Sequence, residues 1–471
     1  MSEKEEKVPV QWYRSTIFCA FLVAATAFTC PGIFGALNGF GAGGGASPDI
    51  SNAANAIVFG MLAVGSLFVG AIANRITPKW ALLIGTLGYT PYAAGLYCVD
   101  KFGTTWLLLF GSVVLGISAC FLWVASGAIL LGYTEENKKG TAMSIKFAFQ
   151  NLGASIGGII ALALNAKKNY RGGVTQSTYI ALMTLMCLGF PFALLLPTAR
   201  KVQRTDGRSV VLSKQPSLAF EFRVLKSIFS KTWVWALIPF IIYAQWFLSY
   251  QWEFNYAYFT VRARALNSFL FYVLGLLSAL GMGQLLDSAR WQRQTRAKIG
   301  FFIVTIFTGT SWILGQIVQV HYSNIEPTID WNDHSYGLGA FVFCLWGFSD
   351  PLVTTYMYWL VGSFSNDLNE TSFLAAIMNS MGSLGSTFGF VVSAKKFSYN
   401  GACALNLGLF FISIPGLAWV VFTKVSNTTH GTKLSGGDYS AGSASEDGRD
   451  IATEKYFEPV KAGVQSTSTP L

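Results

Sequence analysis

The sequence predicts an all-α polytopic membrane protein with twelve transmembrane helices in two six-helix pseudo-repeats. First, hydrophobic residues make up 52% of the 471 residues and charged residues only 12%, against roughly 25% in a soluble protein. Second, twelve apolar blocks are long enough to cross a bilayer. Third, motifs of the first six blocks reappear in the same order in the last six. Aromatic residues are 15%, which excludes a disordered chain.

Each predicted span has about the 20 apolar residues that a helix needs to cross the hydrocarbon core. Cys30-Pro31-Gly32 interrupts the first span, and the eleventh is rich in Ser and Gly. The first block is too long for a cleaved signal peptide, so we expect it to be retained. The predicted spans are 15–37, 51–74, 80–99, 103–131, 143–165, 178–197, 233–259, 266–286, 298–320, 336–361, 372–394 and 402–423.

The distribution of Lys and Arg predicts the orientation. Twelve spans put both termini on one side of the membrane. If that side is the cytoplasm, it carries 25 of the 33 Lys and Arg residues, and the other side carries eight. Cytoplasmic loops are enriched in these residues, so both termini are predicted to be cytoplasmic. The exception is the basic loop Lys167–Arg171 between the fifth and sixth spans. The pattern does not distinguish the plasma membrane from an endomembrane.

Charge is also uneven along the chain. The net charge is +10, and segment 198–232 contributes +6 of it. A basic loop between apolar blocks is typical of attraction to anionic headgroups on the cytoplasmic side, and it does not favour nucleic-acid binding. The predicted organisation is an N-terminal tail, a six-helix bundle, this loop, a second bundle and a disordered tail, at residues 1–14, 15–197, 198–232, 233–423 and 424–471.

Three pairs of motifs predict an internal duplication. They occur on corresponding spans and in the same order, as a parallel repeat about an axis along the membrane normal requires. Two such bundles can rock about a central cavity and expose it to each side in turn. The pairs are Gly70-x-x-x-Asn74-Arg75 with Gly283-x-x-x-Asp287, Leu122-Trp123-x-x-Ser126 with Leu345-Trp346-x-x-Ser349, and Gln150-Asn151-Leu152-Gly153 with Asn379-Ser380-Met381-Gly382.

The first pair resembles the cytoplasmic-loop signature of the major facilitator superfamily. Asn74 stands where that family usually has Asp, which removes the acid of a gate salt bridge from the first copy. Simple positively charged turns are the alternative interpretation. The resemblance implies a cytoplasmic gate motif made of Gly70, Asn74, Arg75, Lys79, Gly283, Asp287, Arg290 and Arg293.

Two further strings narrow the resemblance. They are Ala36-Leu-Asn38-Gly39-Phe-Gly41-Ala-Gly43-Gly44 after the first span and Leu345-Trp346-Gly347-Phe-Ser349-Asp350 in the tenth. They are similar to the Unc-93-like branch, and to its fungal members in particular, over about residues 15–425. The resemblance implies two alternative functions. One is a permease, as in relatives that resemble amino-sugar permeases, and the other is a non-transporting accessory or trafficking protein for other membrane proteins.

Two acids lie inside predicted spans, where a charge is costly and by default indicates function. Asp350 lies near the middle of the tenth span and precedes Pro351, which removes a backbone donor and is expected to kink the helix. Glu253 lies in the outer third of the seventh span. We interpret both as proton-coupling residues. A packing role for Asp350, and pairing of Glu253 with Arg262 or Arg264, are the alternatives.

Aromatic and amide side chains cluster around these acids. Aromatic rings offer flat apolar faces to a sugar, and amides offer paired donors and acceptors. The alternative is an interfacial belt with ordinary packing. The predicted substrate-binding residues are Trp123, Gln150, Trp246, Gln251, Trp346, Tyr356 and Asn379.

Other chemistries find little support in the sequence. No P-loop appears, and the seven cysteines and three histidines show no metal-ligand spacing. We therefore predict no cofactor, no metal site and no enzyme activity. The prediction is an alternating-access carrier of a small polar solute, such as an amino sugar, coupled to protons. Under the alternative function, the partners are other membrane proteins.

Overall fold

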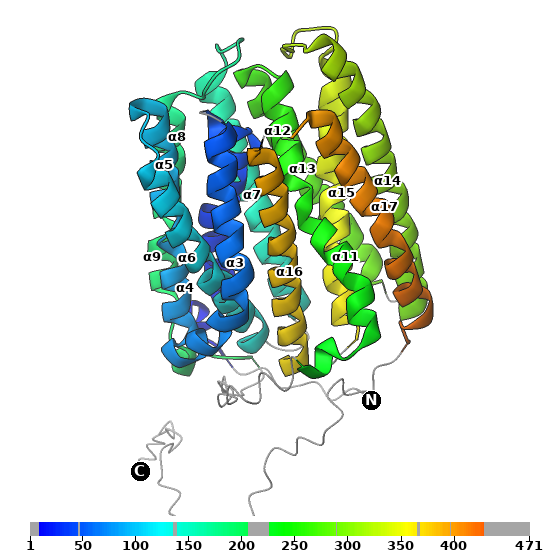
Figure 1. Ribbon diagram of the computed structural model, residues 1–471. Helices are drawn as coiled ribbons and strands as arrows, with labels where there is room; N and C mark the ends of the chain where they lie inside the picture. The colour runs from blue at the N-terminus through cyan, green and yellow to red at the C-terminus, as the bar shows by residue number, and fades with distance from the viewer. Residues whose placement is uncertain are drawn as a thin grey trace, which may run out of the picture. The chain divides into compact units, whose positions relative to one another are not determined.

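The computed structural model describes residues 9–45, 48–134, 139–205, 226–288, 290–364, 368–395 and 397–427. These residues are predominantly helical and form no strand beyond two isolated bridges. Twelve helical segments among them are long and apolar enough to cross a membrane (Figure 1). This confirms the predicted fold class, and the chain is a multi-pass membrane protein.

The first six spans comprise nine helices, because three of these spans are each built from two successive helices. The first span contains α1 and α2, separated by a π-helical turn at Phe28–Gly32. The helices are α1 (Thr16–Ala27), α2 (Ile33–Gly39), α3 (Pro48–Ile76), α4 (Pro78–Thr86), α5 (Tyr89–Phe102), α6 (Trp106–Gly132), α7 (Lys139–Asn165), α8 (Gln176–Cys187) and α9 (Gly189–Leu195).

The last six spans comprise seven helices, and only the first of these spans is divided. The helices are α11 (Thr232–Trp246), α12 (Leu248–Tyr258), α13 (Val261–Leu286), α14 (Arg293–Ile325), α15 (Tyr336–Gly362), α16 (Leu368–Ala394) and α17 (Tyr399–Thr423). α1 begins and α17 ends at the same end of the bundle, which we call the terminal end. The other end is called the opposite end.

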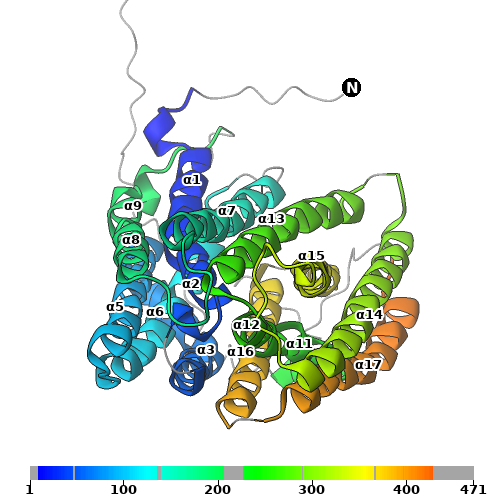
Figure 2. The same cartoon turned by 90° about the horizontal axis from the view of Figure 1, so that it is seen from above.

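Buried apolar side chains form two cores. One contains residues between Cys19 and Val202, and the other contains residues between Ile228 and Val425. Val261 and Ala265, at the start of α13, join the first core. Figure 2 shows the first six spans on one side and the last six on the other, with α3 beside α16 and α7 beside α13. The seam between the two bundles therefore runs along these four helices.

Proline explains the division of the first span. Pro31 has no N–H, so one i→i−4 hydrogen bond is missing, and the helix widens into the π-helical turn. This turn packs tightly against α7. A Cβ atom added at Gly153 would lie 2.3 Å from the carbonyl oxygen of Phe28, so only glycine permits the contact.

Candidate functional site

A cavity of about 640 Å³ lies between the two bundles. Both bundles contribute to its wall, mainly α2, α3, α6 and α7 on one side and α12, α13, α15 and α16 on the other. Along α13 the lining residues extend from Phe271 to Asp287 at the terminal end, where Asp287 is exposed. The cavity therefore reaches from the middle of the helices to the terminal end. Its volume is within the range of small-molecule sites.

Asp350 lies on the cavity wall, in the middle of α15. It is 6% exposed, and its Oδ1 accepts a hydrogen bond of 3.1 Å from Nε2 of Gln251. Its Oδ2 has no hydrogen-bond partner among the described residues. Pro351 lies inside α15, which nevertheless continues as one helix from Tyr336 to Gly362. The carboxyl group is thus held by one amide and keeps one oxygen available to a ligand or a proton.

Three of the predicted substrate-binding residues line the same cavity as Asp350. Trp123 and Gln150 come from the first bundle, and Asn379 comes from the second. The Oε1 atom of Gln150 is buried without a hydrogen-bond partner among the described residues. Asn379 accepts a hydrogen bond of 2.7 Å from the hydroxyl of Tyr358, which also lines the cavity. Polar groups from both bundles therefore converge on one space.

The structure places the other four outside the cavity wall. Gln251 lies behind Asp350 and holds it. Trp346 packs between Tyr250 and Trp312, with ring centroids at 5.6 and 5.2 Å. The remaining two also contact protein groups: the Tyr356 hydroxyl donates to the carbonyl of Ala297 at 2.7 Å, and Trp246 stacks on Phe388.

Glu253 does not line the cavity but lies at the seam, nearer the opposite end. It is 7% exposed and accepts a hydrogen bond from Nδ2 of Asn52, which belongs to α3 of the other bundle. Gln251 and Glu253 are two residues apart on α12, so their side chains leave different faces of the helix. Gln251 contacts Asp350, whereas Glu253 contacts α3. Within the described residues, no direct hydrogen bond joins the two acids.

The glycine-rich string after the first span closes the seam beside Glu253. Gly41 has φ 78°, a conformation that favours glycine. A Cβ added there would lie 2.5 Å from the carbonyl oxygen of Trp252 in the other bundle. Asn255, also in α12, donates a hydrogen bond of 2.9 Å to the carbonyl of Gly39. The string is therefore glycine-rich because backbone of one bundle meets backbone of the other.

A second set of contacts closes the opposite end, and we call it the 166–172 clamp. Segment 166–172 of the first bundle contacts residues 260–264 and 327–330 of the second. Carbonyls of Tyr170 and Lys168 accept hydrogen bonds of 3.0 and 3.2 Å from the backbone N–H groups of Val261 and Arg262. These N–H groups begin α13 and have no partner inside the helix. Arg171 adds a bond of 2.6 Å to the carbonyl of Pro327. The basic loop Lys167–Arg171, which is the exception to the predicted cytoplasmic enrichment of Lys and Arg, thus joins the two bundles.

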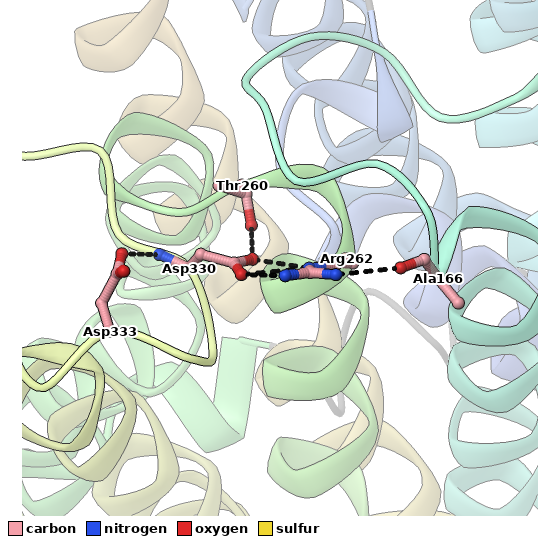
Figure 3. A network of polar contacts seen from close by, with 5 residues as sticks. All are labelled: Ala166, Thr260, Arg262, Asp330 and Asp333. Atoms are coloured by element: carbon pink, nitrogen blue, oxygen red, sulfur yellow. Dashed lines mark hydrogen bonds and ion pairs between the residues drawn. The ribbon is translucent and has the colours of Figure 1, made fainter.

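Figure 3 shows the charged part of the clamp. The guanidinium of Arg262 forms an ion pair with Asp330 and also donates to the carbonyl of Ala166 at 3.4 Å. Thr260 donates a further hydrogen bond of 2.6 Å to Asp330. Asp333 accepts a bond of 2.6 Å from the backbone N–H of Asp330 and fixes the turn. Hydrogen bonds from Arg262 lower the pKa of Asp330 to about 2, so the carboxylate is ionised at any cellular pH.

The predicted gate motif is only partly described. The side chains of Gly70, Asn74 and Arg75 lie outside the described residues. Gly283 and Asp287 line the terminal-end part of the cavity. The others are placed at the surface of that end: Lys79 is half-buried, Arg290 is exposed, and Arg293 donates to the carbonyl of Ser363 at 3.4 Å.

Sequence reasoning missed Lys146, which lies on α7 and is only 2% exposed. Its Nζ atom is 3.6 Å from the ring centroid of Trp123 and 4.3 Å from that of Phe147. Both rings line the cavity. A single basic residue near the start of an apolar span was the available signal. By sequence position alone, this residue is indistinguishable from the other basic residues at the cytoplasmic side.

The model of the Major Facilitator Superfamily matches residues 16–390. An UNC93-like protein of Schizosaccharomyces pombe is 30% identical over 431 residues, which are 89% of this chain and 84% of that protein. The chain belongs to the UNC93-like branch of the Major Facilitator Superfamily. This superfamily fold accounts for the two bundles and the cavity between them.

Two other relatives match this chain over a similar share of its length. UNC93-like protein 1 of Arabidopsis thaliana is 27% identical over 432 residues, covering 90% of this chain and 94% of that protein. "Notoamide biosynthesis cluster protein O'" of Aspergillus versicolor is 31% identical over 414 residues, covering 87% and 90%. The superfamily indicates a transporter, and the names of these relatives specify no solute.

Proposed function

We propose that the protein is a secondary-active, alternating-access transporter of a small polar solute, coupled to protons through Asp350. The observation that carries this proposal is the cavity: it is formed by both bundles and contains a carboxyl group with one unpartnered oxygen. A cavity between two pseudo-repeats is where a rocking-bundle carrier binds its solute. Trp123, Gln150 and Asn379 provide an aromatic face and amide groups for the solute, for which an amino sugar is our first candidate.

The distribution of contacts supports alternating access. The seam is closed at the opposite end by Glu253, Gly41 and the 166–172 clamp. The cavity reaches the terminal end, where Asp287 is exposed. With the termini in the cytoplasm, the arrangement corresponds to an inward-facing state. Rocking of the bundles has to break the closing contacts, most of which are hydrogen bonds to backbone carbonyls.

Asp350 is positioned for proton coupling. It lies half-way along α15 and faces the space that is exposed to each side in turn. A carboxyl group there exchanges a proton with the side to which the cavity is open. The charge of the carboxyl group then affects how tightly the solute binds. Glu253 was predicted to share this role. Its bond to Asn52 supports a different one, which is to close the seam when the cavity faces the terminal end.

The alternative is a non-transporting protein that uses the same fold to bind and escort other membrane proteins. Such a protein needs its outer surface but has no use for an unpartnered carboxyl oxygen in a cavity. The two functions therefore differ in what Asp350 must do. Anionic headgroups at the cytoplasmic face are expected to contact the basic segment 198–232 under either function.

Uptake into liposomes tests the proposal. The full-length protein is reconstituted with a pH gradient, and labelled small polar solutes are screened, beginning with N-acetylglucosamine. We expect at least one solute to accumulate in the presence of the gradient and to equilibrate without it. Collapse of the gradient with a protonophore is the matched control. No accumulation across a broad panel by folded protein would overturn the transport proposal, and capture of partner membrane proteins would then test the alternative.

A further inference from the structure

Two basic side chains among the described residues are almost fully buried, and they differ in their partners. Arg264, at 1% exposure, donates a hydrogen bond of 2.5 Å to the carbonyl of Gly172. Lys146, at 2% exposure, contacts the rings of Trp123 and Phe147. In the part of the chain that the structure describes, no carboxylate lies within ion-pair distance of Lys146. Arg264 is held by a backbone carbonyl and by the ring of Tyr256, although its Nε has no partner among the described residues, whereas the described residues offer Lys146 only aromatic rings.

The position of Lys146 excludes a simple surface role. A lysine near the end of a span normally extends its ammonium group to the interface. Lys146 instead holds its ammonium group against Trp123, which lies seven residues before Leu130 at the end of its span, or about 10 Å of helix rise. An unpaired ammonium group at this depth is unfavourable by several kcal/mol. A bound anion would offset this cost and stabilise the protonated form of the side chain.

The surroundings connect this charge to the cavity. The two rings that contact Nζ form part of the cavity wall. Gln150, one turn further along α7, also lines the cavity, and its Oε1 has no partner among the described residues. Lys146 itself is just behind this wall. Rotation about its side-chain torsions moves the ammonium group along the face of Trp123 toward a ligand.

We propose that Lys146 binds a carboxylate of the transported solute, so that the solute is a small organic acid or zwitterion. This inference rests on the proposed function and narrows its small polar solutes to those with a carboxylate, so that a sugar acid or amino acid replaces the amino sugar as the first candidate. Each bundle then binds a different part of the solute. The first supplies a cation and the Gln150 amide, and the second supplies Asp350, which accepts hydrogen bonds from hydroxyl or amino groups at the other end of the solute.

Matched pairs of solutes test the inference. Glucose and glucuronate, and serinol and serine, differ by a hydroxymethyl group in place of a carboxylate. Uptake of each is measured with the full-length protein in liposomes. For at least one pair, we expect the solute with the carboxylate to be half-saturating at about 10- to 100-fold lower concentration than its partner without one, since a charge-assisted bond in a desolvated site discriminates by that factor.

Substitution assigns the preference to Lys146. Lys146→Met replaces the buried amino group with an apolar side chain that is only one atom shorter, so the protein is expected to fold. It should abolish the preference for the acid, while Lys146→Arg should retain much of it. Lys298→Met is the control, because Lys298 is exposed on α14 and lies outside the cavity wall.

The outcomes separate this inference from the proposed function. If wild-type protein transports the partners without a carboxylate as well as it transports the acids, the inference is overturned and transport stands. Binding is measured independently as the change in melting temperature of the purified protein. Stabilisation by acids that Lys146→Met abolishes, without uptake of any solute, supports carboxylate binding at Lys146 and contradicts transport. Neither stabilisation nor uptake overturns both.

Discussion

The two ends of the seam between the bundles differ in what joins them. At the opposite end, loops and helix ends of one bundle satisfy backbone groups of the other, through the 166–172 clamp and the close approach at Gly41. Toward the terminal end the bundles are separated by a cavity whose wall includes unpartnered polar atoms of Gln150 and Asp350. One end is closed by contacts that need no ligand, and the other holds groups that need one.

This difference explains how closure can be both specific and reversible. Each closing hydrogen bond stabilises the closed arrangement by only about 0.5–1.5 kcal/mol, so several of them together contribute a few kcal/mol. A ligand that binds the two states with different affinity can offset that amount. By contrast, each bundle is held together by a core of buried apolar side chains and is not expected to open. Substitutions at the cavity and at the closed end should therefore have separable effects.

Asp350→Asn should have the largest effect, because it acts on the cavity and not on closure. The amide can still form hydrogen bonds but cannot exchange a proton. We expect gradient-driven accumulation to fall by about 100-fold, within the range of proton-transfer groups in general. Expression and solute exchange without a gradient should persist. The measurement is liposome uptake with and without a pH gradient, and wild-type accumulation by this variant would contradict the coupling role.

Gly41→Ala should disrupt the closed end. The left-handed backbone costs about 1–2 kcal/mol for a residue with a Cβ atom, and the overlap with Trp252 adds about 1–3 kcal/mol. Gly103→Ala is a close control, since Gly103 has φ 69° but nothing within 4 Å of an added Cβ. Thermal unfolding of both variants should show a clearly larger decrease in melting temperature for Gly41→Ala than for Gly103→Ala. Equal losses of thermal stability in the two variants would mean that the left-handed backbone alone, and not the contact with Trp252, requires glycine at position 41.

Arg262→Gln should loosen the 166–172 clamp without changing the cavity. It removes the partly buried ion pair with Asp330, which lies near the protein surface where such pairs contribute modestly, so we expect a roughly two- to fivefold rise in the open-to-closed ratio at this end. Spin labels at Lys101 and His334, both exposed and in different bundles, report the separation in a cysteine-free background. An unchanged distance distribution would show that the backbone bonds of the loop suffice.

Glu253→Gln separates closure from proton coupling. The amide oxygen can still accept the hydrogen bond from Asn52, so a closing role predicts accumulation within about threefold of wild type. Loss of accumulation comparable to that of Asp350→Asn would instead identify Glu253 as a second coupling group. Asn52→Ala is the complementary variant. It should reproduce a closure defect while leaving the pH dependence of uptake unchanged.

Acid should have the smallest effect over the cellular range. The pKa of Asp330 is about 2 in the folded protein, below the ordinary value of about 3.9. Its contribution to stability is therefore fully present above about pH 5 and is lost as pH falls through 4 toward 2. The difference in melting temperature between wild type and Asp330→Asn should be constant from pH 7 to 5 and shrink below pH 4. A difference that already shrinks at pH 6 would contradict the ion pair.

Much of the fold could be predicted because hydropathy and proline act locally. The twelve spans follow from composition over about 20 residues, and the break at Pro31 follows from its missing N–H. Family membership also followed from short strings such as the glycines around Gly41. The site was harder to predict. Trp123, Gln150 and Asn379 line the cavity, but Trp346 and Tyr356 pack inside their own bundle although their types fit a binding site equally well.

The sequence by itself determined the class of the protein, its twelve spans and the presence of two costly acids. Tertiary structure decided which groups meet. Gln251 contacts Asp350 across 99 residues and Asn52 contacts Glu253 across 201, and no local pattern encodes such distances. It also decided that the basic loop 166–172 closes the seam and that Lys146 is buried beside the cavity. The physical reason is that hydropathy depends on neighbours in sequence, whereas partnering and burial depend on how helices pack.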